Sequence, residues 1–262
     1  MSHRNFRRLK SFGLIAVAVC ALTGASPREQ TTEDLVIRGQ RQVLHLYGPP
    51  QGEPVVVTSG DGGWLHLAPH VAETLAARGF FVVGFDAKAY LESFTSTSST
   101  LRPEDEPGDY RQLIERAARE TRRKPTLIGV SEGAGLSVLA AADAQTRPLV
   151  SGVVGLGLPN LNELGWRWKD SVIYVTHGLP REPTFSTRAI VNQLNPLPIA
   201  AIHSTHDEFV PVGEVEGILS QATGPKRLWI VEASNHRFSD NVDEFDKRLV
   251  EAIDWVKQTA PR

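Results

Sequence analysis

The chain has 262 residues, of which 41% are hydrophobic and 22% are charged, which is enough apolar material for one sizeable core in a single α/β domain. This composition excludes a disordered, collagenous or disulfide-stapled protein. Lys and Arg together number 28 against 30 Asp and Glu, so there is no basic surplus to predict a nucleic-acid-binding protein.

The first 25 residues are predicted to be a signal peptide. Basic residues at positions 4–10 precede the apolar stretch FGLIAVAVCAL, and the small residues of a cleavage site follow at positions 23–25. The apolar stretch has 11 residues, whereas a membrane-spanning helix needs about 20. We therefore expect a periplasmic or secreted protein. A lipoprotein is the less favoured alternative, because Val19 precedes Cys20 where lipid-modifying enzymes prefer a small residue.

Cleavage after Ala25 would remove Cys20, the one cysteine of the chain. Disulfides, a cysteine nucleophile and a thiolate metal site are then excluded from the mature protein. Cleavage would also remove four of the 28 basic residues and no acidic ones, which leaves 24 against 30 and a net charge of −6. We interpret residues 26–34 as a linker and residues 35–262 as one folded domain.

From about Val36 onward, short β-branched runs alternate with helical patterns. The runs are almost continuously apolar, as in strands buried on both faces of a parallel sheet, and they predict strands at 55–59, 80–85, 126–130, 149–157, 199–204 and 228–233. Apolar residues recur at intervals of three and four between them, and they predict helices at 67–79, 110–123, 134–144 and 244–256. The sequence thus predicts a doubly wound, mostly parallel α/β sheet.

Two stretches, 96–109 and 159–188, fit neither pattern. Lids and binding walls are often built from such insertions, so we expect the domain to carry a small lid or insertion. Four apolar residues of the second stretch are candidates for a lid that makes a peripheral contact with the membrane, namely Leu161, Leu164, Trp166 and Trp168. Inward packing is the favoured interpretation, because it is commoner for such residues.

The sequence Gly129-Val130-Ser131-Glu132-Gly133 joins a predicted strand to a predicted helix. At this junction the chain must turn sharply, so the backbone of the serine is strained and its neighbours must be nearly free of side chains. Glycines two positions before and after the serine meet that need, and the serine oxygen then projects from the carboxyl edge of the sheet. Ser131 is therefore the candidate nucleophile.

A serine hydroxyl requires a base and a group that orients the base. Asp207 and His236 follow the last two predicted strands, and the order Ser, Asp, His is that of α/β-hydrolases. In this scheme His236 takes the proton of Ser131 and Asp207 fixes the imidazole. Glu208 is the alternative carboxylate, but Asp207 is preferred because it precedes Val210-Pro211 by the usual interval.

The glycine-rich sequence Ser59-Gly60-Asp61-Gly62-Gly63-Trp64 follows a predicted strand and precedes a predicted helix. We expect the backbone N–H groups of Asp61 and Gly62 to form an oxyanion hole together with that of Glu132. A tight turn capped by Asp61 is a compatible interpretation. The Asp61 carboxylate is also a candidate to recognise a cationic group on the substrate, and Trp64 is assigned to substrate binding.

No cofactor or metal is predicted. His203, His206 and Asp207 lie within five residues, but the spacings of the usual metal motifs are absent from the sequence. The glycine-rich sequence lacks the lysine-serine or lysine-threonine pair of a phosphate-binding loop. The expected partner is a small-molecule or lipid ester substrate, with no nucleic acid.

Several segments together make the chain resemble the α/β-hydrolases of the bacterial virulence protein VirJ/AcvB type. They are SGDGGW, the helix LAPHVAETLAARGF, the strand VVGFD, the GxSxGA motif with its helix, and NHRFSD near the end, so the resemblance covers about Val55 to the C-terminus. It implies the α/β-hydrolase fold for residues 35–262, with Ser131, Asp207 and His236 on the catalytic positions.

The resemblance also implies an exported serine hydrolase that cleaves aminoacyl esters of phosphatidylglycerol, although some members are discussed as factors that assist secretion systems. The chain departs from the family where Glu132 replaces an aromatic residue, where RFSDN replaces an HFDGD-like string, and where the residue after GxSxGA is not acidic.

Taken together, the residues predict an exported serine esterase that acts through an acyl-enzyme. A peptidase or a lipase of the same fold stays open, because amide and ester cleavage use the same constellation. The alternative from another class is a non-catalytic binding or secretion-assisting protein on a hydrolase scaffold.

Overall fold

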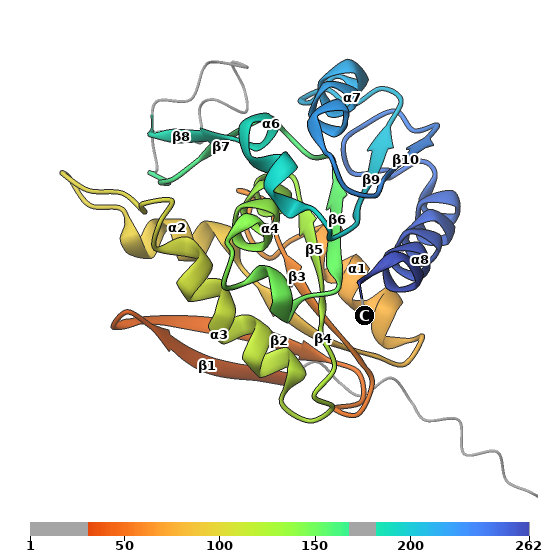
Figure 1. Cartoon of the computed structure of the whole chain (residues 1–262). Helices are drawn as coiled ribbons and strands as arrows, with labels where there is room; N and C mark the ends of the chain where they lie inside the picture. The colour runs from red at the N-terminus through yellow and green to blue at the C-terminus, as the bar shows by residue number, and fades with distance from the viewer. Residues whose placement is uncertain (1–30, 168–181, 262) are drawn as a thin grey trace, which may run out of the picture.

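The computed structural model describes residues 31–167 and 182–261. Its centre is an eight-stranded sheet with the strand order β1-β2-β4-β3-β5-β6-β9-β10 (Figure 1). These strands are β1 (Thr31–Ile37), β2 (Gln40–Tyr47), β3 (Glu53–Thr58), β4 (Phe80–Phe85), β5 (Thr126–Val130), β6 (Gly152–Leu156), β9 (Ile199–Ser204) and β10 (Lys226–Val231). The predicted signal peptide and Cys20 lie outside the described residues.

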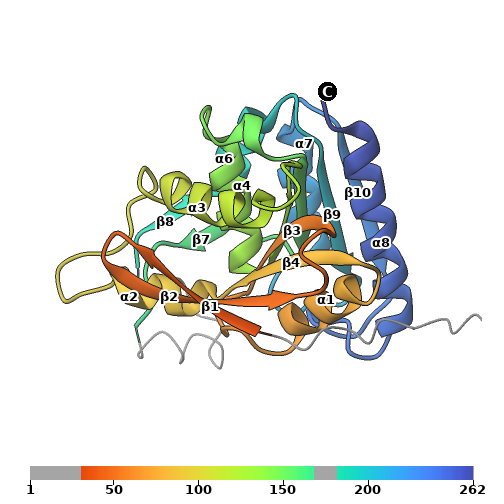
Figure 2. The ribbon, with the colours of Figure 1, turned by 90° about the horizontal axis from the view of Figure 1, so that it is seen from below.

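Helices cover both faces of this sheet. The α-helices are α1 (Leu67–Ala76), α2 (Ala87–Phe94), α3 (Glu106–Ala118), α4 (Glu132–Ala142), α6 (Thr187–Ile190), α7 (Val212–Gln221) and α8 (Val242–Thr259), and the 3-10 helices are η1 (Arg147–Leu149) and η3 (Val191–Leu194). Figure 2 shows α1 and α8 on one face of the sheet, with α3 and α4 on the other. A small antiparallel sheet pairs β7 (Leu161–Glu163) with β8 (Thr184–Ser186).

The six strands from β3 onward in the large sheet run parallel to one another, and β2 joins them antiparallel to β4. Alternate residues of each strand therefore enter two separate cores. On β3, for example, Val56 packs with the core under α3 and α4, and Val55 and Val57 pack with the core under α1 and α8. Burial on both faces explains the continuous apolar runs. The predicted doubly wound, mostly parallel α/β fold is confirmed.

The antiparallel β1–β2 hairpin was not predicted. It begins at Thr31, so residues 31–34 of the interpreted linker belong to the sheet. Arg38 and Gly39 turn the hairpin with φ values of 45° and 83°, as a two-residue turn between twisted strands requires. Both strands alternate exposed and covered residues, because they lie at the edge of the sheet and have one wet face.

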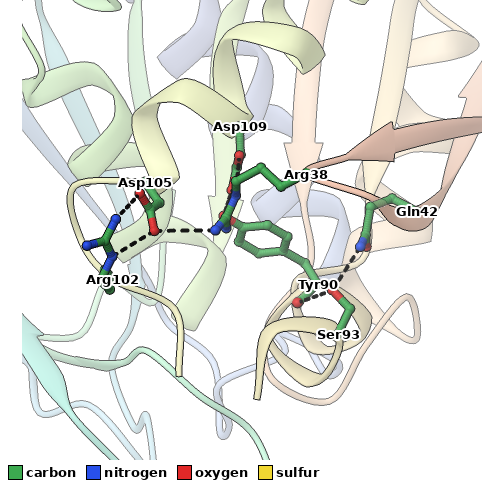
Figure 3. A network of polar contacts seen from close by, with 7 residues as sticks. All are labelled: Arg38, Gln42, Tyr90, Ser93, Arg102, Asp105 and Asp109. Carbon is green, nitrogen blue, oxygen red and sulfur yellow. Dashed lines mark hydrogen bonds and ion pairs between the residues drawn. The ribbon is translucent and has the colours of Figure 1, made fainter. Parts of the chain in front are cut away.

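Side-chain contacts fasten this hairpin to α2 and α3 (Figure 3). The Arg38 guanidinium donates to Asp109 at 2.9 and 2.6 Å and to Asp105 at 3.3 Å. The Tyr90 hydroxyl donates to the same Asp109 carboxylate at 2.6 Å. A second bond joins Gln42 to Ser93 at 2.9 Å. The buried carboxylate of α3 thus receives its hydrogen bonds from two other elements.

The predicted membrane-facing lid is only partly exposed. Leu164 and Trp166 are 3% and 9% exposed and pack into the core, whereas Leu161 is 48% exposed. The Leu101 N–H donates to Leu164 O and the Trp166 N–H to Thr95 Oγ1, so these hydrogen bonds draw the segment inward against the loop after α2. Trp168 lies outside the described residues. Within residues 31–167 and 182–261, no helix combines the length and apolar character of a membrane span.

Candidate active site

Ser131 occupies the sharp turn between β5 and α4. Its φ of 50° and ψ of −120° lie in a region that non-glycine residues rarely adopt, at an energetic penalty of about 1–3 kcal/mol. A Cβ atom on Gly129 would lie 2.1 Å from Gly133 O, and one on Gly133 would lie 2.2 Å from Ser59 O. Both glycines are therefore needed for the tight approach of helix and strands around this serine.

Asp207 and His236, from the loops after β9 and β10, form a short hydrogen bond. The distance from His236 Nδ1 to Asp207 Oδ2 is 2.6 Å, and the aspartate side chain is fully buried. Its other oxygen accepts the N–H groups of Phe209 and Val210 at 3.0 and 2.8 Å. Burial would raise the pKa of Asp207, but the bond from His236 and these N–H groups outweigh it and lower the pKa. An ionised carboxylate only accepts, so Nδ1 carries the proton and Nε2 is left as a base.

The imidazole and Ser131 both contact the end of β6. The Ser131 N–H donates to Leu156 O at 2.8 Å, and the His236 ring covers the next residue, Gly157, where a Cβ would lie 2.3 Å from Cε1. Nε2 of His236 is buried and has no hydrogen-bond partner among the described residues. Catalytic hydrogen bonds of this kind often form only when substrate is bound.

Two neighbouring residues, Glu208 and His203, have other contacts, and this supports the Asp207–His236 pair. Glu208 accepts the backbone N–H of His236 at 2.7 Å, so it holds the loop and does not orient the imidazole. His203 is fully buried and donates from Nε2 to Val210 O at 2.8 Å. Burial lowers the pKa of His203, which keeps it neutral. Over the described part of the chain, no three acidic, histidine or cysteine side chains group as a metal site would require.

The glycine-rich loop after β3 passes beside the nucleophile. A Cβ on Gly60 would lie 3.3 Å from Ser131 Cβ, and the Gly63 N–H closes a turn onto Gly60 O at 3.0 Å. Asp61 and Gly62 form the corner of that turn. Glu132 is the first residue of α4, where backbone N–H groups have no partner within the helix. Of the three predicted oxyanion-hole residues, Glu132 adjoins Ser131, and Asp61 and Gly62 follow the Gly60 that lies beside it.

Trp64, which was assigned to substrate binding, packs on the sheet. Its ring stacks on His45 with centroids 4.7 Å apart, and its Nε1 donates to the Tyr47 hydroxyl at 3.3 Å. The ring fills the space above Gly84, where a Cβ would lie 2.2 Å from it. These contacts give Trp64 a structural role at the start of α1, because β2 offers it an aromatic surface that the sequence analysis did not foresee.

An acidic group adjoins Ser131, and of its carboxylates only that of Asp61 was predicted to have a role. The Glu132 side chain is only 7% exposed, and its Oε1 has no hydrogen-bond partner among the described residues. Burial raises the pKa of Glu132 well above its usual value, and the charges of Asp61 and Glu163 raise it further. Glu163 lies on β7, inside the stretch for which no element was predicted. Three carboxyl groups thus converge next to the nucleophile.

The sheet, the strained serine after β5 and the histidine and aspartate after the last two strands define the α/β-hydrolase fold. The chain is similar in structure to the esterase domain of a Rhodothermus marinus protein, with 17% identity, a TM-score of 0.62 and coverage of 88% of this chain and 99% of that one. Dienelactone hydrolase from Anabaena variabilis shares 17% identity at a TM-score of 0.60, with coverage of 86% and 96%. An esterase from Pyrococcus furiosus shares 18% identity at a TM-score of 0.63, with coverage of 86% of this chain and 90% of that one.

The predicted resemblance to one family is confirmed as well. The model of the bacterial virulence protein (VirJ) family matches residues 53–167, a segment that includes the glycine-rich loop and Ser131. Asp207 and His236 lie beyond it. Among curated proteins, none matches this sequence.

Proposed function

We propose that the protein is a serine hydrolase that cleaves a carboxylic ester through an acyl-enzyme on Ser131. The observation that carries this proposal is the buried 2.6 Å hydrogen bond between Asp207 and His236, made beside the strained turn that presents Ser131. This bond fixes the tautomer in which Nε2 is the free base. The esterases and hydrolases of the same fold support the reaction class.

The reaction divides into two proton-balanced halves. His236 Nε2 takes the hydroxyl proton as Ser131 Oγ attacks the ester carbonyl carbon, and it then gives that proton to the departing alcohol. A water molecule, deprotonated by the same imidazole, then attacks the acyl-enzyme; the bond to Ser131 Oγ breaks, the imidazolium returns the proton to that oxygen, and the carboxylic acid is released. In both halves the N–H groups of Glu132 and of Asp61 or Gly62 donate to the carbonyl oxygen as it becomes negative, and Asp207 stabilises the imidazolium.

We propose that the acyl portion of the substrate is an amino acid and that the whole substrate is an aminoacyl ester of phosphatidylglycerol. The VirJ match supports this choice, and so do the carboxyl groups of Glu132, Asp61 and Glu163 beside the nucleophile. A substrate ammonium group would favour the ionised form of Glu132, whose pKa burial and its acidic neighbours raise. A charge-assisted hydrogen bond to that ammonium would then select cationic acyl groups.

Export to the periplasm or the cell exterior is part of the proposal, supported by the predicted signal peptide at residues 1–25. The expected N-terminus of the exported protein lies just after Ala25, and sequencing of the protein recovered from the periplasm of a bacterial host tests this. An intact N-terminus in that fraction would contradict it.

The proposed mechanism is tested with a fluorophosphonate label and a phenyl ester. The wild type should be labelled at Ser131, and Ser131→Ala should lower kcat by about 10⁴-fold or more. Ser220→Ala, on the exposed face of α7, is the matched control and should behave as wild type. Absence of a label together with no hydrolysis by the wild type would favour the non-catalytic binding protein. Unchanged hydrolysis by Ser131→Ala would contradict the proposed mechanism.

The proposed substrate class is tested with a matched pair of esters, an alanyl ester and its N-acetylated counterpart. Glu132→Gln should lower kcat/KM for the alanyl ester by about 10-fold or more, as expected for loss of a charge-assisted hydrogen bond. The acetylated ester should be affected far less. An equal effect on both esters would rule out ammonium recognition by this residue. Glu115→Gln, on the exposed face of α3, is the control. Mass spectrometry of a membrane extract treated with the enzyme would identify the lipid.

A further inference from the structure

A cavity of about 550 Å³ lies beside the loop that carries His236. Its walls come from the start of α1, from the loop after β9, from the segment between β10 and α8 and from the start of α8. They include Leu67, Phe209, Asn235, Arg237, Val242 and Phe245. Its volume falls in the range of about 300–1,000 Å³ that is usual for small-molecule sites. No step of the proposed mechanism involves this cavity.

The cavity lies on the histidine side of the candidate active site. Asn235 and Arg237, which flank His236, both line it, and so does Phe209. The Phe209 ring meets the His236 ring edge-on, with centroids 5.6 Å apart. Glu132 is not among the lining residues, and neither is any other residue of α4 or β7. The cavity therefore lies against the loop of His236 and is separate from the acidic group.

The two sides of an ester have different requirements at such a site. The acyl carbonyl must lie against the N–H groups at the start of α4 and in the glycine-rich loop. The oxygen of the leaving alcohol must instead lie where His236 can protonate it. A substrate in this orientation directs its alcohol portion past the imidazole and toward Phe209.

From this placement we infer that the cavity is the subsite for the alcohol portion of the ester, and that Phe209 and Val242 determine which alcohols it accepts. The inference rests on the proposed function. Its lining mixes polar side chains with apolar ones, and of the apolar ones Leu67 and Phe245 are buried and Val242 is half-buried. These apolar side chains suit an alcohol with an apolar body larger than a methyl or ethyl group, because apolar surface gains by leaving water.

Hydrogen bonds hold the walls of this subsite in place. The Asn235 side chain accepts the N–H groups of Arg237 and Ser239 at 3.0 and 3.3 Å and donates to Ser239 Oγ at 2.7 Å. Glu208 holds the backbone of His236 from the opposite loop. A subsite formed before the substrate arrives loses little entropy on binding and can discriminate by shape.

The test compares phenyl acetate with 1-naphthyl acetate, two esters with the same acyl group and leaving alcohols of similar acidity. Val242→Trp fills the cavity, so the ratio of kcat/KM for naphthyl over phenyl acetate should fall by about 10-fold or more. Both esters give the same acetyl-enzyme. The partition of this intermediate between water and added methanol should therefore be the same whichever ester is used. Val36→Trp, on the exposed face of β1, is the matched control and should leave the ratio unchanged.

A second variant keeps the test decisive if Val242→Trp does not fold. Phe209 is 44% exposed, so Phe209→Ala should fold, enlarge the cavity and raise the naphthyl over phenyl ratio. The ratio cancels any general effect on His236. An unchanged ratio in the folded variants, or a change in acyl selectivity instead, would overturn the subsite. Hydrolysis retained in Ser131→Ala would overturn the proposed function itself, which keeps the two failures apart.

Discussion

Glu106 is expected to make the protein less stable as the pH rises. It is the first residue of α3 and is fully buried, and neither carboxyl oxygen has a hydrogen-bond partner among the described residues. Burial raises the pKa of Glu106 well above the ordinary value of 4.5, and the nearby charges of Asp109 and Asp143 raise it further. The native state therefore holds a proton that the unfolded chain releases.

The size of the effect follows from proton linkage. Below the unfolded-state pKa of 4.5, both states hold the proton and Glu106 has no pH-dependent effect. Above it, the native state holds one proton more, and the free energy of unfolding falls by about 1.4 kcal/mol per pH unit. The fall ends where the native carboxyl ionises. Replacing Glu106 by glutamine keeps the size of the side chain and removes this loss.

Urea unfolding followed by circular dichroism at pH 5.5, 6.5 and 7.5 measures the effect. The stability of Glu106→Gln relative to wild type should rise by about 1.4 kcal/mol with each step in pH until the native carboxyl ionises. Glu115→Gln changes an exposed carboxyl of the same helix and should show no such slope. A difference between Glu106→Gln and wild type that is constant from pH 5.5 to 7.5 would refute the assignment of a neutral buried carboxyl.

Two further substitutions probe the packing, each with a matched control, by the same urea measurement. Gly133→Ala places a Cβ 2.2 Å from the backbone oxygen of Ser59 and should lower the stability by about 1–3 kcal/mol or more. Its control is Gly213→Ala in α7, where the added Cβ has open space around it and should raise the stability by about 0.5–1 kcal/mol. Arg38→Ala removes the partner of the buried Asp109 and should lower the stability by about 2 kcal/mol, whereas loss of the exposed Arg41–Asp34 pair in Arg41→Ala should change it little. Equal effects within either pair of variants would contradict the packing described.

The parts of the fold that sequence predicted well are those that local chemistry determines. Strands buried on both faces must be apolar throughout, so the parallel strands from β3 to β10 stood out. The turn at Ser131 needs glycines at both 129 and 133 because backbone atoms approach within van der Waals distance there. The order of parallel strand ends then placed Asp207 and His236 at the same edge of the sheet as Ser131.

Features that depend on contacts between distant segments were missed. The β1–β2 hairpin has a wet face, and polar residues interrupt its apolar ones, so it lacks the pattern of the central strands. Because this hairpin was not predicted, the aromatic surface that His45 and Tyr47 offer to Trp64 was not expected. Trp64 was therefore assigned to substrate binding. Glu163 was missed because β7 has only three residues, too few for a periodic pattern.

The structure connects two of the departures from the VirJ pattern, the acidic Glu132 and the missing acidic residue at Gly135. A Cβ at Gly135 would lie 1.8 Å from Asn162 Oδ1, and Asn162 is fully buried on β7, where it donates to Thr187 Oγ1 at 2.7 Å. No side chain fits at position 135 while Asn162 is present. The close approach of β7 to α4 that excludes a carboxylate there also brings Glu163 beside Glu132, so this chain has its acidic group one helical turn nearer the nucleophile. Because this position borders the oxyanion hole, the exchange would act on the acyl group and leave the alcohol side unchanged.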